Sequence, residues 1–310
     1  MAALAVAWNE VEMTVACLRS VSETAPDALL FFVDSGSVRD PGPRLAELLP
    51  EARLLRLDAN RGYAAALNAG AELALEAGAT HLLFLNNDTV VEAGAVDTLL
   101  KEAGRHPDAI LAPTIVYAAL PDRVWSAGGY VVGPLLENHH LGKDRPRPDP
   151  AEPHPVAWAT ACALLVSAGT YRRLGPFDAR YFLYLEDTDW CLRAGRQGIP
   201  TLHVPGAVVR HHVSTSVETL PSWNVRYYAY RNRYYLALRN STPWARPLVP
   251  LDALWTLVKA GLRSVSSGAY RRDHYYHART RGVVDFLRGR MGEAPASGAR
   301  RAPAPESVAS

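Results

Sequence analysis

The first hundred residues alternate between short apolar runs and longer segments in which apolar residues recur every three or four positions. The apolar runs predict strands at residues 2–7, 29–33, 52–57 and 81–85, and the periodic segments predict helices at 11–22, 44–49, 62–78 and 93–104. Strands that alternate with helices are typical of an α/β domain with a mainly parallel sheet flanked by helices. Ligands of such sheets lie at the carboxyl ends of the strands.

The rest of the chain changes character twice. Residues 109–155 have no clear period, and residues 137–155 are polar and proline-rich, which predicts a mobile surface loop. Apolar residues 156–166 and 201–209 predict further buried segments, and the pattern is helical from Trp223 onward. We therefore expect an α/β domain at 1–222, a helical region at 223–292 and a disordered tail at 293–310.

The net charge of +2 hides an uneven distribution along the 310 residues. Residues 1–222 contain 18 Lys and Arg against 26 Asp and Glu, whereas residues 223–301 contain 15 against 4. This basic third indicates an anionic partner (nucleic acid, a phospholipid surface or a phosphorylated acceptor), unless arginine is simply abundant in this chain. Within it, residues 248–265 have an apolar face that fits either a membrane surface or packing against protein.

Missing motifs exclude several classes of protein. The three cysteines form no CxxC pair, so we expect neither a disulfide framework nor a zinc site, and the expected compartment is the reducing cytoplasm. The N-terminus has no basic lead of a signal peptide, and no stretch reaches the roughly 18 apolar residues of a spanning helix. A phosphate loop, a GxGxxG turn and a GxSxG elbow are absent. Since no nucleic-acid-binding signature is recognised either, we expect no nucleic-acid partner.

Three carboxylates lie close together in the segment LYLEDTDWCLRAG. Acidic side chains favour the first turn of a helix, and Asp189 can pair with Arg193 one turn later, so two of the three need no further role. Asp187, at the expected strand–helix junction, is the best placed to act as a general base, which must be held rigidly at the edge of a cavity. Trp190 fits either a sugar-stacking or a core position.

Other polar side chains follow predicted strands. Asp34 in FVDSGS and Asp88 in LLFLNND either cap turns or bind ligands: the imide N–H of a pyrimidine for Asp34 and a hard divalent cation for Asp88. His211 and His212 follow the strand at 201–209. An imidazole beside a cation held by an aspartate favours a manganese-type ion over magnesium. No single one of these signals is specific.

The order of five motifs is more specific than any one of them. Within residues 2–240 the chain contains, in succession, FVDSGS, NRGYAAALNAG, LLFLNND, LGPFDARYFLYLEDTDWCLRAG and VPGAVVRHHVSTS. This order resembles the family-2 glycosyltransferases of the GT-A fold, and is most similar to bacterial rhamnosyltransferase-type enzymes. The resemblance implies a Rossmann-like GT-A sheet followed by a helical, basic C-terminal extension.

The resemblance also implies a nucleotide site and a metal site. The nucleotide set is Asp34 at the uracil or thymine base, Asn60 and Gly62 in the neighbouring loop, and Asn87 and Asp88 in the DxD-type motif. The metal set is Asp88 with His211, which would hold Mn²⁺ or Mg²⁺. Residues 86–88 contain one carboxylate, where some family members have two or three.

For catalysis, the resemblance implies that Asp187 is the base and that Glu186 is its acidic neighbour near the bound sugars. The expected donor and acceptor pocket contains Trp158, Thr160 and Trp190. Two positions depart from the family pattern: Ser35 stands where asparagine is usual, and Ala161 stands where glycine is usual.

The implied reaction is an inverting, metal-dependent sugar transfer in cell-surface polysaccharide assembly. The donor would be a UDP- or dTDP-sugar such as dTDP-rhamnose, and the acceptor a hydroxyl of a glycan or of a polyprenyl-diphosphate-linked sugar. The implied location is the cytoplasm, with peripheral contact at the inner face of the cell membrane.

Two alternatives stay open. One is a sugar nucleotidyltransferase, which needs a Gly- and Arg-rich loop where this chain has VAWNEVEM. The other is a non-catalytic nucleotide-sugar-binding scaffold, which would be favoured by a damaged base or metal motif, whereas Asp88, Asp187 and His211 are all present.

Overall fold

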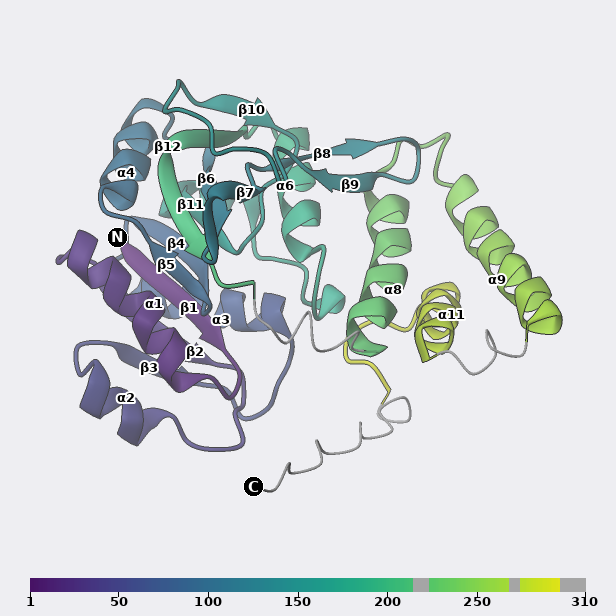
Figure 1. Cartoon of the computed structure of the whole chain (residues 1–310), viewed down its shortest axis with the longest axis horizontal. Helices are drawn as coiled ribbons and strands as arrows, with labels where there is room; N and C mark the ends of the chain where they lie inside the picture. The colour runs from purple at the N-terminus through teal and green to yellow at the C-terminus, as the bar shows by residue number, and fades with distance from the viewer. Residues whose placement is uncertain (214–222, 268–273, 296–310) are drawn as a thin grey trace.

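A central sheet organises the molecule in the computed structural model, which describes residues 1–213, 223–267 and 274–295 (Figure 1). Its strands are β1 (Ala2–Ala7), β2 (Leu29–Asp34), β3 (Arg53–Arg56), β4 (His81–Asn86), β5 (Thr89–Val91), β6 (Ile110–Tyr117), β7 (Leu120–Ser126), β10 (His154–Val156), β11 (Ala163–Ser167) and β12 (Thr201–His211). The strand order is β10-β12-β6-β11-β4-β1-β2-β3, with β5 on β12 and β7 on β6. A separate hairpin pairs β8 (Gly129–Val132) with β9 (Glu137–His140).

The described helices fall into two groups. Those of the α/β part are α1 (Val11–Thr24), α2 (Gly42–Leu48), α3 (Tyr63–Glu76), α4 (Ala95–Arg105), α5 (Ala168–Leu174), the 3-10 helix η1 (Ala179–Tyr181) and α6 (Glu186–Arg196). Those of the C-terminal part are α8 (Trp223–Asn240), α9 (Leu248–Ser266) and α11 (His274–Leu287). Every strand and helix predicted in the first hundred residues is confirmed, to within a few residues at its ends.

The sheet is mostly but not wholly parallel. The strands β4, β1, β2 and β3 run parallel to one another, as do β6 and β12. β11 lies antiparallel between β4 and β6, and β5, β7 and β10 also pair antiparallel. An apolar run indicates burial rather than direction, so the sequence could not assign these antiparallel pairings.

The middle of the chain is more regular than its sequence indicates. The strands β6 to β9 occupy most of residues 110–140, which had no clear period. The continuous loop predicted at 137–155 is wrong at both ends, because β9 starts it and β10 ends it. The sequence of β9 has no hydrophobic pattern because this strand belongs to a separate two-stranded hairpin, and its side chains are partly or fully exposed.

Helices cover both faces of the sheet, since successive strand residues point to opposite faces. In β1, Ala3 belongs to the core under α1, α2 and α4, whereas its neighbour Leu4 belongs to the core under α3, α5 and α6. The small residues of α3 permit close packing: a Cβ atom on Gly70 would lie 2.7 Å from Cγ2 of Val33. Both faces of the sheet are therefore buried, and its strand ends are left for ligands.

The C-terminal helices pack together beside the β8–β9 hairpin (Figure 1). Their shared core consists of Tyr234, Ala237, Val249, Ala253, Val283 and Phe286, with Leu135 of the hairpin packed against it. α8 also contacts α6 of the α/β part. The disordered tail expected at 293–310 lies outside the described residues from position 296 onward.

The face of α9 that was expected to be apolar is exposed. Val249, Ala253, Thr256 and Ala260 are the buried residues of this helix. Large apolar side chains on the rest of its surface are exposed, namely Leu248, Leu251, Leu254, Trp255, Val258, Leu262 and Val265. In the described part of the chain, no helix has both the length and the hydropathy needed to cross a bilayer.

Candidate active site

The carboxyl ends of β2, β4 and β12 point to the same edge of the sheet, and polar residues gather there. Asp34 ends β2, and Asp88 lies two residues after the end of β4. β5 then pairs antiparallel with β12, with Thr89 opposite His211. This pairing places Nε2 of His211 3.1 Å from Oδ1 of Asp88.

Asp88 and His211 form a buried pair whose chemistry fits a divalent cation. Both side chains are less than a tenth exposed, and the Trp125 ring packs edge-on against the imidazole, with centroids 4.5 Å apart. A carboxylate with an imidazole suits Mn²⁺. The described residues contain no group of three His, Cys, Asp or Glu side chains that could hold a metal. Asp88 and His211 are the side chains at this edge that would hold such a cation.

Asp34 organises the turn after β2. Its Oδ1 accepts hydrogen bonds from the backbone N–H of Ser37, at 3.0 Å, and from the Ser37 hydroxyl. Nε of Arg56 lies 3.4 Å from Oδ2 of the same carboxylate, which is fully buried. The turn-capping alternative is thus observed directly, and contact with a nucleotide base stays a prediction.

Asn60 and Gly62 link the start of α3 to the segment that precedes α6. Oδ1 of Asn60 accepts a hydrogen bond from the Gly62 N–H at 2.9 Å. Gly62 has a φ of +91°, and a Cβ atom there would lie 2.4 Å from the carbonyl oxygen of Phe182. Tyr63 donates its N–H to that carbonyl oxygen at 2.7 Å. Only glycine allows the two backbones to approach this closely.

Asp187 is a half-buried carboxylate held by backbone donors. Its Oδ2 accepts from the Ala161 N–H at 3.1 Å, and its Oδ1 accepts from the Thr188 N–H at 2.6 Å. Burial raises the pKa of Asp187 above its ordinary value, and the hydrogen bonds from Ala161, Thr188 and Thr160 oppose that shift. A carboxylate that is oriented, partly desolvated and raised in pKa has the properties of a general base.

Glu186 is more deeply buried than its neighbour. It is 4% exposed, and its Oε2 has no hydrogen-bond partner among the described residues. Burial raises the pKa of Glu186 well above its ordinary value, and the negative charge of Asp187 raises it further. The pKa of Glu186 is thus raised more strongly than that of Asp187, so Asp187 is the one that ionises more readily.

The segment before α6 has an unusual backbone and is held by α8. Positive φ values occur at Phe182 (64°), Tyr184 (68°) and Leu185 (71°). Such values are strained for residues with a side chain and require support from their surroundings. The side-chain amide of Asn232 supplies it by donating to the carbonyl oxygens of Tyr181, Leu183 and Tyr184, at 3.0, 2.7 and 2.9 Å.

Arg231 fixes the orientation of Asn232. Its side chain is fully buried, and its Nε donates to Oδ1 of Asn232 at 2.9 Å. Its other nitrogens donate to the carbonyl oxygens of Tyr181, at 2.8 Å, and Gly292, at 2.5 Å. Its guanidinium also lies over the Tyr228 ring, 4.9 Å from the centroid. Arg231 and Asn232, called here the α8 clamp, thus join α8 to the backbone that leads into Glu186 and Asp187.

A comparison with protein families shows the class of the protein. The family model described as "Glycosyl transferase family 2" matches residues 3–167, more than half of the chain. The chain belongs to glycosyl transferase family 2. It is therefore a glycosyltransferase, and the nucleotidyltransferase and non-catalytic alternatives are set aside.

Relatives of this glycosyltransferase include enzymes named for rhamnose transfer. The chain is 31% identical over 267 residues to the N-acetylglucosaminyl-diphospho-decaprenol L-rhamnosyltransferase of Mycobacterium tuberculosis, covering 80% of this chain and 84% of that protein. It is 23% identical over 207 residues to the dTDP-rhamnosyl transferase RfbF of Shigella flexneri, covering 64% of this chain and 67% of that protein. The resemblance to rhamnosyltransferase-type enzymes is thereby confirmed.

Solved structures establish the GT-A fold of this glycosyltransferase. GalNAc-T7 with UDP, GalNAc and Mn²⁺ matches with a TM-score of 0.57 and 14% identity, over 81% of this chain and 54% of that chain. The mannosyltransferase PcManGT of Pyrobaculum calidifontis, with GDP-Man and Mn²⁺, matches with a TM-score of 0.54 and 16% identity, over 92% and 86%. At these identities the likeness supports the fold alone.

The remaining predicted residues of this glycosyltransferase occupy different positions. Asp189 pairs with Arg193 at 2.9 Å, as expected for a structural carboxylate. Trp190 is fully buried, stacks on Phe177 with centroids 4.6 Å apart, and donates its Nε1–H to the Gly175 carbonyl oxygen. Its ring is therefore part of the core rather than a cavity wall.

Trp158 and Thr160 belong to the segment between β10 and β11, which contacts Asp187 through the Ala161 N–H. Trp158 is 2% exposed and donates its Nε1–H to the Tyr130 carbonyl oxygen at 3.2 Å. A Cβ atom on Gly129 would collide with its indole ring, at 2.2 Å. Thr160 is partly exposed and forms a hydrogen bond that lowers the pKa of Asp187. Asn87 is partly exposed in the turn between β4 and β5.

Two features of the site were missed at the level of sequence. Tyr63 donates its hydroxyl to Oδ1 of Asn86 at 2.7 Å and contacts the Ala161 carbonyl oxygen at 3.1 Å, so it ties α3 to β4. The α8 clamp lies in the segment YRNRYYLALRN, to which no motif of the sequence assigns a role. Arg next to Asn on one helix was a usable signal, because together they offer many donors and need a polar partner when buried.

Proposed function

We propose that this glycosyltransferase moves rhamnose from dTDP-rhamnose to a sugar hydroxyl of a polyprenyl-diphosphate-linked acceptor, with inversion at the anomeric carbon. The names of the mycobacterial and Shigella relatives support the donor and the acceptor class. The observation that carries the mechanism is Asp187, an oriented carboxylate whose pKa is raised by burial. A cytoplasmic reaction at the inner membrane face is consistent with such an acceptor.

Asp187 acts as the general base in this proposal. Its carboxylate takes the proton of the acceptor hydroxyl while that oxygen forms a bond to the anomeric carbon of the donor sugar. The bond from the anomeric carbon to the diphosphate breaks on the opposite face, and its electron pair leaves with the nucleoside diphosphate. Hydrogen bonds from Ala161 and Thr188 hold the base in place during the proton transfer.

The residues at the strand ends bind the nucleotide. Asp88 and His211 hold a divalent cation, Mn²⁺ or Mg²⁺, and that cation would neutralise charge on the diphosphate leaving group. Asn87 lies at the ribose and diphosphate. Asp34, Asn60 and Gly62 border the base, and Thr160 borders the donor sugar. In this assignment the fully buried Trp190 and nearly buried Trp158 support the pocket from behind.

Replacing the base tests the proposal. Asp187→Asn keeps the shape of the side chain but removes the proton acceptor, so transfer should fall by at least about a hundredfold. Stabilisation of the folded protein by dTDP should persist, because the base does not bind the nucleotide. The matched control is Asp97→Asn, the same change at an exposed position of α4, which should leave turnover unaltered. Unchanged turnover in Asp187→Asn would show that Asp187 is not the general base.

The stereochemistry gives a second test of the same mechanism. A single in-line displacement inverts the anomeric centre, so the product linkage should have the opposite configuration to that of the donor. The anomeric coupling constants of the isolated product, measured by NMR, report that configuration. A product that retains the donor configuration is incompatible with direct attack assisted by Asp187.

We also propose that α9 touches the membrane that holds the acceptor. Its exposed apolar face contains Leu251, Leu254 and Leu262, and Lys259 and Arg263 lie on the same helix. Apolar side chains beside cationic ones are what an interfacial helix needs on an anionic bilayer. A lipid-linked acceptor would bring the enzyme to such a surface.

A further inference from the structure

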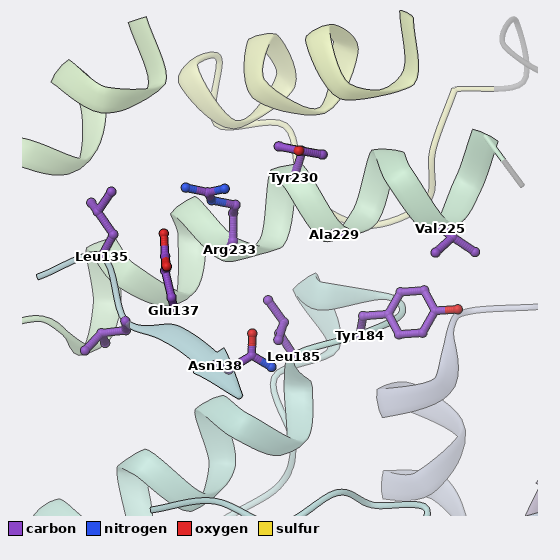
Figure 2. Close-up of a pocket in the computed structure, with 10 residues that line it drawn as sticks. Leu135, Glu137, Asn138, Tyr184, Leu185, Val225, Ala229, Tyr230 and Arg233 are labelled. Atoms are coloured by element: carbon purple, nitrogen blue, oxygen red, sulfur yellow. The ribbon is translucent and has the colours of Figure 1, made fainter. Parts of the chain in front are cut away.

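A cavity of about 450 Å³ adjoins the start of α6 (Figure 2). It lies between the β8–β9 hairpin and α8. Its lining residues are Leu135, Leu136, Glu137, Asn138, Tyr184, Leu185, Val225, Ala229, Tyr230 and Arg233. None of these is a candidate nucleotide or metal residue, and the volume is within the range of about 300–1,000 Å³ that is usual for ligand sites.

The cavity is joined to the catalytic carboxylates through its wall. Leu185 is the residue that immediately precedes α6, and Glu186 and Asp187 are the first two residues of that helix. Figure 2 shows Leu185 at the start of this helix with Asn138 of β9 beside it. A molecule in the cavity therefore lies next to the segment that presents the general base.

The lining is apolar apart from a few polar groups. Leucine, valine, alanine and tyrosine side chains form most of the wall, and Arg233 of α8 contributes a guanidinium (Figure 2). Arg233 is 35% exposed, and its closest acidic atom among the described ion pairs, Oδ2 of Asp252, is 3.8 Å away. Such a long contact leaves the guanidinium able to bind an anion, and its planar fork fits phosphate oxygens.

The cavity also leads toward the C-terminal helices. Leu135 lines it and packs against the shared core of α8, α9 and α11. An apolar wall and an accessible guanidinium suit a ligand that has a hydrocarbon chain and a diphosphate.

We infer that this cavity binds the diphosphate and the first isoprene units of a polyprenyl-diphosphate-linked acceptor. The inference rests on the proposed function. Arg233 binds the diphosphate, and the side chains around Ala229 contact the prenyl chain. Asn138, beside Leu185, lies where it can hydrogen-bond the attached sugar, whose hydroxyl points to Asp187. Glu137 also lines the cavity, and Figure 2 shows its carboxylate on the hairpin side, next to Arg233.

Direct binding of farnesyl diphosphate to the full chain tests the inference without requiring turnover. Ala229→Trp fills the cavity and Arg233→Gln removes its cation, so each should weaken binding by about tenfold or more in isothermal titration calorimetry. Leu238→Trp adds the same indole to α8 at a residue that does not line the cavity, and Arg288→Gln removes an exposed arginine elsewhere. Both controls should bind farnesyl diphosphate as the wild type does.

Three results would overturn the inference. The wild type does not bind farnesyl diphosphate, Ala229→Trp binds it as tightly as the wild type does, or inorganic diphosphate binds the wild type as tightly as farnesyl diphosphate does. The last result would mean that the apolar wall contributes nothing. Asp187→Asn should bind farnesyl diphosphate normally. If the wild type binds the probe through the cavity but transfers no sugar, the proposed function fails and the cavity assignment stands.

Discussion

At the scale of single residues, the adjacent carboxyl groups of Glu186 and Asp187 have different surroundings. Asp187 receives hydrogen bonds from backbone donors, whereas Oε2 of Glu186 has no such partner in the described residues. Burial raises the pKa of both, and the charge of Asp187 raises that of Glu186 further. Of the two, Asp187 is the one that ionises more readily, which fits the proposal that it is the base.

This difference predicts how stability depends on pH. The raised pKa of Glu186 means that the folded state holds its proton to a higher pH than the unfolded state does. Stability from this group is therefore lost as the pH rises above the ordinary glutamate value toward the raised one. Glu186→Gln removes the titration, so its advantage in Tm over the wild type should grow from about pH 5 to about pH 8.

Differential scanning calorimetry across that pH range makes the measurement. Each kcal/mol of relief should appear as about 2–4 °C in Tm. Glu72→Gln, at an exposed position of α3, is the matched control and should show no growing advantage. An advantage of Glu186→Gln that shrinks as the pH rises would contradict the assignment of the proton to Glu186.

The histidine pair 211 and 212 allows a test of the metal site. If Asp88 and His211 hold the cation, Mn²⁺ should increase the thermal stabilisation by dTDP, which reaches about 2.7 kcal/mol at a hundredfold excess over Kd. His211→Ala should lose the Mn²⁺-dependent part of that stabilisation. His212→Ala, one residue further and exposed, should keep it. An equal Mn²⁺ response in both variants would exclude His211 as a ligand.

The candidate residues at strand ends could be found from sequence because the polarity of the chain changes abruptly there. Asp88 follows an apolar run, and His211 follows another, so a parallel sheet brings both to one edge. Hydrogen bonds that cross the sequence could not be found in this way. Tyr63 reaches Asn86 and Ala161 only because α3 packs under β4, which no local pattern encodes.

At the scale of elements, the segment before α6 depends on support from outside itself. Three residues with positive φ precede Glu186, and the amide of Asn232 donates to three carbonyl oxygens of this segment. The Gly62 backbone contacts the same segment from α3. The position of Asp187, the proposed general base, is therefore set jointly by α3, α6 and α8.

Removing the clamp donor should affect turnover more than nucleotide binding. Asn232→Asp keeps the side-chain size but replaces a donor by an acceptor that faces three carbonyl oxygens. We expect kcat to fall by about 10²-fold through misplacement of Asp187, with the Kd of dTDP nearly unchanged. The free energy of unfolding should fall by about 1–3 kcal/mol.

Steady-state kinetics and denaturant unfolding measure these two effects. Asn224→Asp makes the same chemical change at an exposed position of α8 and should alter neither. A pH profile of kcat in Asn232→Asp that is the same as in the wild type would contradict a positioning role. A purely structural role would lower stability without changing that profile.

The elements themselves were largely predictable, and their exceptions have physical causes. The helices and strands of the first hundred residues have strong periods because both faces of their sheet are buried. β9 has no such period because neither face of the hairpin is fully buried. The antiparallel direction of β11 depends on its neighbours β4 and β6, which lie far away in the sequence.

At the scale of the whole molecule, charge and exposed apolar surface are concentrated in the same third of the chain. Residues 223–301 carry the excess of basic side chains, and α9 carries seven exposed apolar residues. The cavity proposed for the acceptor is lined both by residues of α8 and by Leu185, which directly precedes Glu186. In the proposed arrangement, a lipid-linked acceptor would join the bilayer, this cavity and Asp187.

The exposed face of α9 gives the last prediction. Leu254 and Leu262 are 50% and 64% exposed, and a bilayer interface would bury both. Wild-type protein should float with vesicles that contain phosphatidylglycerol, and less so at high salt, because part of the attraction is electrostatic. The double variant Leu254→Glu/Leu262→Glu should reduce the vesicle-bound fraction at least about tenfold, since each buried leucine contributes about 1.5–3 kcal/mol.

Val38→Glu provides the matched control, because Val38 is an apolar residue of the β2–α2 connection that is 85% exposed. It should float as the wild type does. The double variant should still transfer sugar to a short, water-soluble acceptor, since α9 contributes no lining residue to the cavity. If the double variant floats normally, the membrane assignment is wrong. If, in the absence of vesicles, the wild type sediments as a dimer and the double variant as a monomer, the apolar face of α9 joins two copies of the chain.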